Sequence, residues 1–376
     1  MFENTIINTQ NQLENKCKNL KNEKKIAVDL EADSMYHFKE KICVIQIADS
    51  RGPFIIDPLI INNLSFLEPI LEDSKITKIF HGADFDIRSF YRDYNIKINN
   101  LFDTEIASRF LGIKERSLAA LLKKYFNISI DKTLQKTDWS KRPLSKKMIL
   151  YSLTDVKYLI ELSEILKKEL INIKRLEWAK EEFELQTRVR YENNNTPLFL
   201  KFKGAGKMNR KSLGILENLL KMRQKIAKQK NRPLFKIISS NSIAKLAYEK
   251  PISITQLKKI KALSPIEIKI YGNACIKAIL MGLEIKDENL PLYPQKKKPE
   301  FNPNVSGRIK ALKKMRLEKS KETGIESGFL INNNLIIAIA NKFPLNKEEL
   351  IKIKGMKNWQ KQILSNNIIE TMKKCD

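Results

Sequence analysis

The feature that most limits the fold of this 376-residue chain is a repeat at a constant offset of 93 residues. Met222-Arg223 matches Met315-Arg316 and Pro251 matches Pro344. Apolar residues agree, without any gap, at positions 238 and 331, 243 and 336, 247 and 340, 257 and 350, and 260 and 353. Chance similarity between helices rich in Lys and Ile would not keep one register over this length. The repeat therefore predicts two copies of a small helical domain.

Two polar stretches divide the chain. "YENNNTPL", residues 191–198, has no apolar periodicity and predicts a linker. "NLPLYPQKKKPEFNPN", residues 289–304, is rich in Pro and Lys and predicts another. We expect a first domain at residues 1–195, a helical domain at 205–285, a linker at 286–304 and a second helical domain at 305–376.

The first 110 residues alternate between strand-like and helix-like segments. Strands are predicted at "NTIIN" and "ITKIFHG" and at residues 26–28, 42–48 and 53–58, with 26–28 and 42–48 paired as a hairpin through a short connection. Thr9 with Gln12 is a capping-box pattern for a helix over residues 10–20, and "LSFLEPILED" is also helical. Residues 104–126 and 145–190 are predicted to be mainly helical, the latter beginning at Ser145. This order of elements predicts an α/β domain built on a sheet.

The net charge of +27 is unevenly distributed. Residues 1–200 carry 32 basic and 29 acidic side chains, whereas residues 201–376 carry 38 and 14, a net +24. A general bias toward Lys would have spread the excess over the whole chain. The distribution predicts that the second half binds a polyanion, most often nucleic acid.

The cysteines and the apolar runs indicate the compartment. Cys17, Cys43, Cys275 and Cys375 have no paired spacing, so neither a disulfide framework nor a zinc site is indicated. The N-terminus has no signal-like apolar core, and no apolar run approaches the roughly 20 residues needed to cross a bilayer. We expect a soluble cytoplasmic protein with no membrane contact.

Two acids end a strand predicted for the core. In "KKIAVDLEADS", residues 24–34, Asp29 and Glu31 are two apart and therefore face the same side of the strand. Adjacent anions repel each other, and burial raises the cost unless protons or cations neutralise them. A strand end exposed to water explains a single pair of this kind equally well, so a metal site requires further acids.

The segment "HGADFDIRSF" supplies two further candidates on a predicted helix. Asp84 lies four residues before Arg88, which is the spacing of a surface ion pair. Asp86 instead has Ala83 and Phe90 as neighbours on its face and so borders the apolar stripe. We therefore choose Asp86.

The helix predicted from Ser145 supplies the last two candidates. Tyr151 and Asp155 are four residues apart and share a face. They flank an apolar stripe that would dock the helix on the sheet, formed by Leu153, Val156, Ile160 and Leu166. Alone, this pair would be an ordinary helix surface, but it gains meaning beside the other acids.

The four acids Asp29, Glu31, Asp86 and Asp155 offer only oxygen ligands, which suit Mg²⁺ or Mn²⁺ rather than zinc. Such a set can hold two divalent cations about 3.5–4 Å apart, one acting on the attacking water and one on the leaving oxygen of a phosphodiester. Tyr151 has an ordinary pKa near 10 and is a poor general base at neutral pH. We expect it to orient the water.

This order of residues resembles the DEDD superfamily of 3′-to-5′ exonucleases, tyrosine branch. The elements of the resemblance are D-x-E, an Asp five residues after "HG", and Y-x-x-x-D. Residues 134–159, "LQKTDWSKRPLSKKMILYSLTDVKYL", are very similar to the ribonuclease D signature, and the repeated basic segments resemble HRDC domains. The resemblance covers essentially the whole chain. It implies a ribonuclease H-like mixed sheet with flanking helices, followed by two small all-α domains.

The resemblance also implies an activity and its residues. Ribonuclease D proteins release nucleoside 5′-monophosphates from RNA 3′ ends, typically in tRNA maturation, so the expected partner is RNA, and no protein partner is implied. The family's four metal carboxylates correspond to Asp29, Glu31, Asp86 and Asp155, and its water-positioning tyrosine corresponds to Tyr151. A histidine branch would need His where this chain has Leu150.

Three further residues are candidate nucleic-acid contacts. His81 is either near the substrate path or structural, and Lys136 and Arg142 either contact phosphates or belong to a solvated loop. The first repeat also departs from the HRDC pattern, because "KIKALSPIE" stands where the second repeat has "KIKG". The turn at residues 261–265 is therefore left open.

Two other functions remain possible from the sequence. A DNA 3′-to-5′ exonuclease of the same fold, used in repair or proofreading, would need the same acids. A nucleic-acid-binding protein with a relic nuclease domain is disfavoured, because all five motif residues are present.

Overall fold

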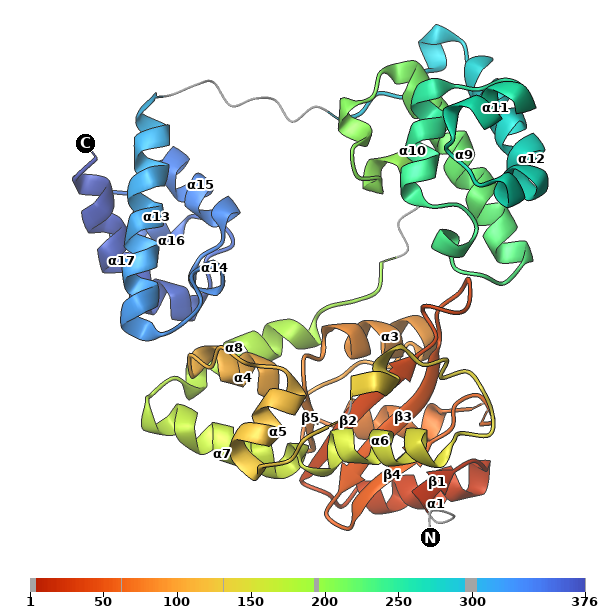
Figure 1. The fold of residues 1–376 in the computed structure, drawn as a ribbon. Coiled ribbons are helices and arrows are strands. Elements are labelled where there is room, and N and C mark those ends of the chain that lie inside the picture. Colours follow the sequence, from red (N-terminus) through yellow and green to blue (C-terminus); the bar gives the residue numbers. More distant parts are fainter. Residues whose placement is uncertain (1–4, 62, 131, 193–195, 295–302, 376) are drawn as a thin grey trace. The chain divides into compact units, whose positions relative to one another are not determined.

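The computed structural model describes residues 5–61, 63–130, 132–192, 196–294 and 303–375 (Figure 1). Residues 193–195 and 295–302 of the two predicted linkers lie outside the described residues. The chain forms two compact units. One comprises residues 1–32, 42–191 and 299–376, and the other comprises residues 33–41 and 192–298.

A six-stranded mixed sheet organises the first unit. Its strands are β1 (Ile6–Ile7), β2 (Lys25–Ala32), β3 (Ile42–Asp49), β4 (Gly52–Ile56), β5 (Thr77–Phe80) and β6 (Leu101–Asp103), in the order β1-β4-β3-β2-β5-β6. The β2–β3 and β3–β4 pairs are antiparallel, and the other three pairs are parallel. The predicted mixed sheet is confirmed. β6 was not predicted, since three residues are too few to show a strand pattern.

Helices flank this sheet. They are α1 (Gln10–Leu20), α2 (Glu68–Leu71), α3 (Asp84–Tyr94), α4 (Thr104–Phe110), α5 (Leu118–Phe126), α6 (Lys146–Lys157), α7 (Leu159–Asn172) and α8 (Leu176–Thr187), with 3₁₀ turns η2 (Ser65–Leu67) and η3 (Lys132–Lys136). The predicted capping box of α1 is formed, with Gln12 N donating to the Thr9 hydroxyl at 3.3 Å. The segment predicted at 104–126 is two helices, because Gly112 takes a φ of 72° after α4.

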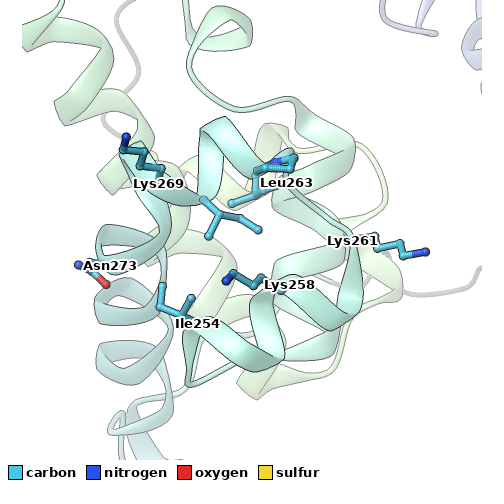
Figure 2. Close-up of a pocket in the computed structure, with 8 residues that line it drawn as sticks. Ile254, Lys258, Lys261, Leu263, Lys269 and Asn273 are labelled. Atoms are coloured by element: carbon cyan, nitrogen blue, oxygen red, sulfur yellow. The ribbon is translucent and has the colours of Figure 1, made fainter.

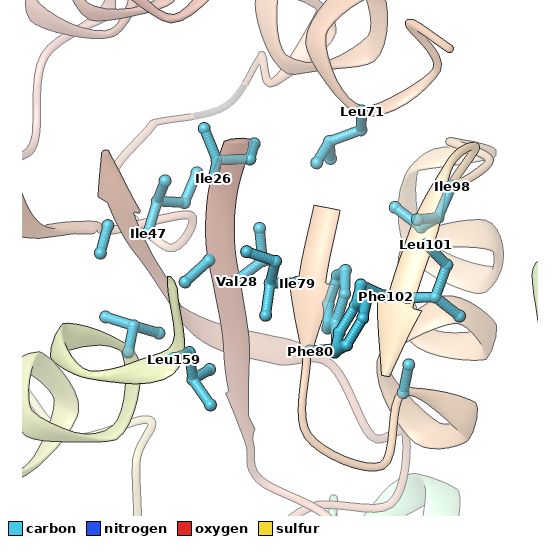
Figure 3. Packing of buried hydrophobic residues seen from close by; sticks show 14 of the residues in the cluster. Ile26, Val28, Ile47, Leu71, Ile79, Phe80, Ile98, Leu101, Phe102 and Leu159 are labelled. Carbon is cyan, nitrogen blue, oxygen red and sulfur yellow. The ribbon is translucent and has the colours of Figure 1, made fainter. Parts of the chain in front are cut away.

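The core of the sheet is aliphatic and aromatic. Figure 3 shows Ile26 and Val28 of β2, Ile79 and Phe80 of β5 and Phe102 of β6 packed beside one another. Ile26 and Val28 are fully buried and alternate along β2 with the positions of Asp29 and Glu31. The packing of β2 therefore fixes the direction in which both acids point.

The remaining helices form two clusters with separate cores. The first has α9 (Arg210–Gln229), α10 (Ser240–Glu249), α11 (Ile254–Ile260) and α12 (Pro265–Leu283), with η4 (Leu198–Lys201), η5 (Ala205–Lys207), η6 (Leu234–Lys236) and η7 (Asp287–Asn289). The second has α13 (Pro303–Thr323), α14 (Ser327–Leu330), α15 (Asn333–Lys342), α16 (Lys347–Ile351) and α17 (Asn358–Lys373). No helix in the described part of the chain is long and apolar enough to cross a membrane.

The two clusters repeat each other at the predicted offset. Their helices begin at 210 and 303, 240 and 333, 254 and 347, and 265 and 358, which are 93 residues apart in every case. The shared Arg makes the same contact in both copies: Arg223 donates to Ile238 O at 3.1 Å, and Arg316 donates to Ile331 O at 3.0 Å. The match of Met-Arg pairs in the sequence thus reflects a shared hydrogen bond before the second helix.

The turn left open in the first repeat has a clear conformation. Lys261 takes the left-handed conformation with φ 49°, whereas the second repeat uses Gly355 with φ 91°. Position 355 corresponds to 262, so the left-handed residue moves by one position between copies. The first repeat therefore makes the turn without Gly, at the conformational cost of a left-handed Lys.

The second helical cluster shares core residues with the sheet domain inside the first unit. Trp359 is only 2% exposed and packs with Phe110, Trp178 and Phe329. Lys357 Nζ lies 2.6 Å from Glu182 of α8. The sequence had predicted a domain separated by a linker, and nothing in the repeat pattern indicated this packing.

Candidate active site

The first two acids stand in the C-terminal half of β2, the strand between β3 and β5. In the ladder with β3, Asp29 pairs with Gln46 and Glu31 pairs with Val44. The register shifts immediately after Glu31, which is the sign of a β-bulge. Bulges redirect side chains next to active sites, and this one ends the regular ladder at the acid pair.

The third acid comes from the first turn of α3. Asp86 is 6% exposed, whereas Asp84 is exposed and its carboxylate accepts from Arg88 Nε at 2.8 Å. The turn before α3 is held by Asp103, whose carboxylate accepts from the backbone N–H groups of Gly82 at 3.0 Å and Ala83 at 2.8 Å. Asp103 thereby fixes the point at which α3 begins.

The last two candidates come from α6. Ser145 caps this helix by accepting from Met148 N at 3.3 Å, as predicted. Asp155 is 5% exposed and Tyr151 is half-buried, with its ring 6.0 Å from that of Trp139. α6 packs against β3 and β4 through an apolar cluster that includes Trp139. This packing brings Tyr151 and Asp155 to the side of β2 that carries the first two acids.

The raised pKa values of the acids show that they lie close together. Burial raises the pKa of Glu31 to about 10, with further contributions from the charges of Asp29, Asp155 and Asp86. Burial and then Asp29 raise the pKa of Asp155 to about 8. Burial raises the pKa of Asp29 to about 7, and burial followed by Asp29 raises that of Asp86 well above its ordinary value. Four carboxyl groups from three separate segments therefore share one electrostatic environment.

Tyr151 belongs to the same environment. Its pKa is raised by burial and then by Asp155, Glu31 and Asp29, so the phenol stays protonated at neutral pH. The Tyr151 hydroxyl is hydrogen-bonded to the Asp155 carboxylate and to the Gln135 side chain. A protonated phenol is a hydrogen-bond donor and not a general base.

A cavity of about 340 Å³ opens over these groups. It is lined by Asp29, Glu31, His81, Ser117, Leu118, Ala119, Ile130, Gln135, Tyr151 and Asp155. Polar and charged groups occupy one part of the lining, and the side chains of Leu118, Ala119 and Ile130 supply an apolar wall. A volume at the small end of the range for ligand sites suits a single nucleotide better than a duplex.

His81 lies at this cavity. Its Nδ1 is 2.9 Å from the Thr104 hydroxyl. Burial lowers the pKa of the imidazole, although Asp103 and Glu105 oppose this effect, so the ring is neutral near pH 7. It can form a hydrogen bond to a substrate but cannot supply a positive charge to a phosphate.

The two basic candidates differ from each other. Lys136 is exposed at the end of η3, next to Gln135 of the cavity lining. Arg142 instead uses its guanidinium inside the protein, where it donates to Asp57 Oδ1 at 2.7 Å, Cys43 O at 2.7 Å and Trp139 O at 2.8 Å. Arg142 thus holds the segment before α6 against the sheet, and we do not include it among RNA contacts below.

The sequence analysis missed several residues of this region. Gln46 is fully buried opposite Asp29, and its amide has no hydrogen-bond partner within the residues that the structure describes. The signal for it was a single amide in the otherwise apolar run "ICVIQIA". Gln135 and the apolar wall gave no comparable signal, since their role depends on where distant segments meet.

The donor set fits divalent cations chemically. Four carboxylates whose mutual repulsion raises their pKa values are neutralised by a hard cation with oxygen ligands. In the present side-chain conformations, no group of three or more His, Cys, Asp or Glu residues in the described ranges is already arranged to hold a metal ion. Binding of a cation at this position therefore requires rotation of these side chains toward it.

A pH dependence of stability follows from the two pKa values near neutrality. The folded-state pKa values of Asp29 and Asp155, about 7 and 8, lie above the ordinary 3.8. The stability that protonation provides is present at low pH and is lost as pH rises through these folded-state values. With a chelator present, Tm should fall by a few degrees between pH 5.5 and pH 9, as thermal unfolding followed by circular dichroism would show.

Two variants test the origin of this slope. Asp29→Asn should flatten it, because the amide does not ionise. Asp84→Asn should not, since Arg88 holds the pKa of Asp84 below its ordinary value. An unchanged slope in Asp29→Asn would show that Asp29 does not carry the effect.

Comparison with known proteins agrees with this architecture. A family model described as "3'-5' exonuclease" matches residues 4–171, and one described as "HRDC domain" matches residues 212–279 and 306–371. The fold and site thus define an exonuclease that acts from the 3′ end and carries a duplicated HRDC domain.

Whole-chain relatives narrow the class. Ribonuclease D of Bartonella henselae is 30% identical over 340 residues, covering 89% of this chain and 83% of that protein. Ribonuclease D of Desulfotalea psychrophila is 30% identical over 344 residues, covering 90% and 91%. The chain belongs to the ribonuclease D family and is a 3′-to-5′ exoribonuclease of a divalent-metal-dependent superfamily.

Solved structures support the fold over nearly the full length. The crystal structure of Escherichia coli RNase D, described as "an exoribonuclease involved in structured RNA processing", matches with a TM-score of 0.76 at 23% identity, covering 98% of both chains. A protein from Bifidobacterium adolescentis matches with a TM-score of 0.81 at 21% identity, covering 98% of this chain and 97% of that one. The predicted sheet domain followed by helical domains is thus confirmed.

Proposed function

We propose that this exoribonuclease holds two divalent cations, Mg²⁺ or Mn²⁺, between Asp29, Glu31, Asp86 and Asp155, and releases nucleoside 5′-monophosphates one at a time. The observation that supports this most is the mutual elevation of the pKa values of these carboxyl groups. A site of this kind is unfavourable without cations and becomes favourable with them. The arrangement is thus better suited to cation binding than to stability.

Bound cations would supply Lewis-acid stabilisation of the attacking and leaving oxygens at the phosphorus. The chain's own residues supply position. The Tyr151 hydroxyl, which is held by Asp155 and Gln135, is available to orient the attacking water by hydrogen bonding. The apolar wall at Leu118 and Ala119 supports the terminal base and admits one unpaired nucleotide.

The substrate we propose is a tRNA precursor with a 3′ extension, met in the cytoplasm. Two observations favour a folded RNA: the net +24 of residues 201–376, and the likeness to a nuclease described as acting in structured RNA processing. The DNA alternative has no such support, since the relatives are ribonucleases by name. The four acids themselves do not distinguish RNA from DNA.

A single set of incubations tests this function. The purified chain should shorten a 3′-extended tRNA precursor in the presence of Mg²⁺ or Mn²⁺ and release mononucleotides identified by mass spectrometry. A chelator should stop the reaction, and a DNA strand of matched sequence should be degraded much more slowly. Equal rates on RNA and DNA, or hydrolysis that survives the chelator, would contradict the proposal.

A further inference from the structure

The second HRDC copy binds anionic groups at one corner. At the start of α17, the backbone N–H groups of Asn358 and Trp359 donate to the Glu181 carboxylate at 2.8 and 2.9 Å. Lys357 Nζ donates to Glu182 at 2.6 Å. The corner between α16 and α17 is therefore an anion site that α8 of the same unit fills.

The first copy has a cavity at the corresponding corner, between α11 and α12. Its volume is about 590 Å³, and it is lined by Ile254, Lys258, Lys261, Leu263, Pro265, Ile268, Lys269 and Asn273. Figure 2 shows Ile254, Lys258 and Leu263 around the hollow, with Lys261 and Lys269 on either side of it. The lining thus combines an apolar floor with a basic rim.

The basic rim is specific to the first copy. At an offset of 93 residues, Lys258 and Lys269 correspond to Ile351 and Gln362. Gln362 serves the protein contact, since its side-chain oxygen accepts from Trp178 Nε1 at 2.9 Å. In the first copy, the side chains of Lys258, Lys261 and Lys269 are exposed and make no hydrogen bond or ion pair with any other described residue. Three unneutralised ammonium groups around one groove favour an anionic occupant.

The apolar contacts also differ between the copies. Trp359, the buried anchor of the second copy, corresponds to Ile266, which is 71% exposed. Large buried aromatic residues are the usual anchors of protein interfaces, and the first copy has none at this position. The N-terminus of α12 is also closed by its own capping box between Ser264 and Glu267. A protein helix docked as in the second copy would thus lack both of its main attachments.

We propose that the groove between α11 and α12 binds the RNA substrate. Phosphates would lie at Lys258, Lys261 and Lys269, and a ribose or base would rest on the apolar floor. This inference rests on the proposed function and adds to it the surface that recognises the body of the RNA away from the 3′ end. The duplication would then have given one copy a protein contact and the other an RNA contact.

A matched pair of double variants tests the site. Lys258→Ala with Lys269→Ala removes two charges from the groove, and Lys228→Ala with Lys245→Ala removes two exposed charges elsewhere in the same domain. Binding of a 3′-extended tRNA precursor is measured by fluorescence anisotropy in chelator, so that no hydrolysis occurs. We expect the groove variant to bind about fivefold to tenfold more weakly, with a log Kd against log salt slope reduced by about 1 to 2.

The control pair should change Kd by less than about twofold, and Lys258→Arg with Lys269→Arg should retain parental binding. Equal binding by the parent and the groove variant would overturn the proposal and leave an acidic protein segment as the remaining candidate. This result is independent of the proposed function, which fails only if the parent does not hydrolyse RNA with Mg²⁺ or Mn²⁺.

Discussion

Replacing Asp29 by Asn should lower the rate of RNA hydrolysis at least about a thousandfold. The side chain stands at the centre of the carboxyl cluster, since it raises the pKa of Glu31, Asp86 and Asp155. Loss of one anionic ligand would remove several kcal/mol of cation-dependent stabilisation of the transition state, and about 4 kcal/mol corresponds to about a thousandfold. Single-turnover hydrolysis of a short RNA measures this change without a contribution from the HRDC copies.

The fold of this variant should be retained or stabilised. An amide at position 29 removes repulsion from the cluster, so the Tm without metal should not fall. The rise in Tm that Mg²⁺ or Mn²⁺ produces in the parent should be lost. Asp84→Asn is the matched control, because Asp84 is exposed and paired with Arg88 outside the cavity. Activity of Asp29→Asn near the parental rate would remove the site assignment.

The sequence predicted much of this site because its spacing rules are local. Residues i and i+2 on a strand and i and i+4 on a helix share a face whatever the rest of the fold does. The choice of Asp86 over Asp84 needed only the position of Arg88 and the apolar stripe. The structure places Asp84 in that surface ion pair and Asp86 in the interior.

The parts that were not predicted depend on contacts between distant segments. Asp103 accepts from backbone groups about twenty residues away, and Leu118 meets the acids only after the sheet has formed. Arg142 resembled a free loop charge because its partners, Asp57 and Cys43, lie far back in the sequence. No local pattern marks such pairs.

The duplicated domains show the same division. The positions of their helices followed from one constant offset, which a sequence displays directly. Their different environments did not, since Glu181 and Glu182 resemble the exposed acids of any amphipathic helix. The structure instead gives both carboxylates partners at the start of α17. Removal of residues 201–376 would expose this contact, so truncation is a poor way to separate catalysis from RNA binding.

Replacing Trp359 by Ala should lower the free energy of unfolding of the first unit by about 3–5 kcal/mol, the usual cost of removing a buried aromatic ring. The indole is 2% exposed, packs against Phe110, Trp178 and Phe329, and donates from Nε1 to Glu182 at 2.7 Å. Its loss leaves a cavity and weakens the neutralisation of Glu182, which is itself buried and paired with Lys357. Urea unfolding followed by circular dichroism measures the change.

The duplication provides the control for this variant. Ile266→Ala alters the corresponding position of the first copy, which is 71% exposed, and should change stability by no more than about 0.5 kcal/mol. Unfolding of Trp359→Ala should also lower the temperature at which exonuclease activity is lost, because the second HRDC copy and the sheet domain share core residues. If activity and the sheet transition were unchanged while only the C-terminal helices lost structure, the two would be independent folding units, and the contact at Glu181 and Glu182 would contribute little to the stability of the sheet domain.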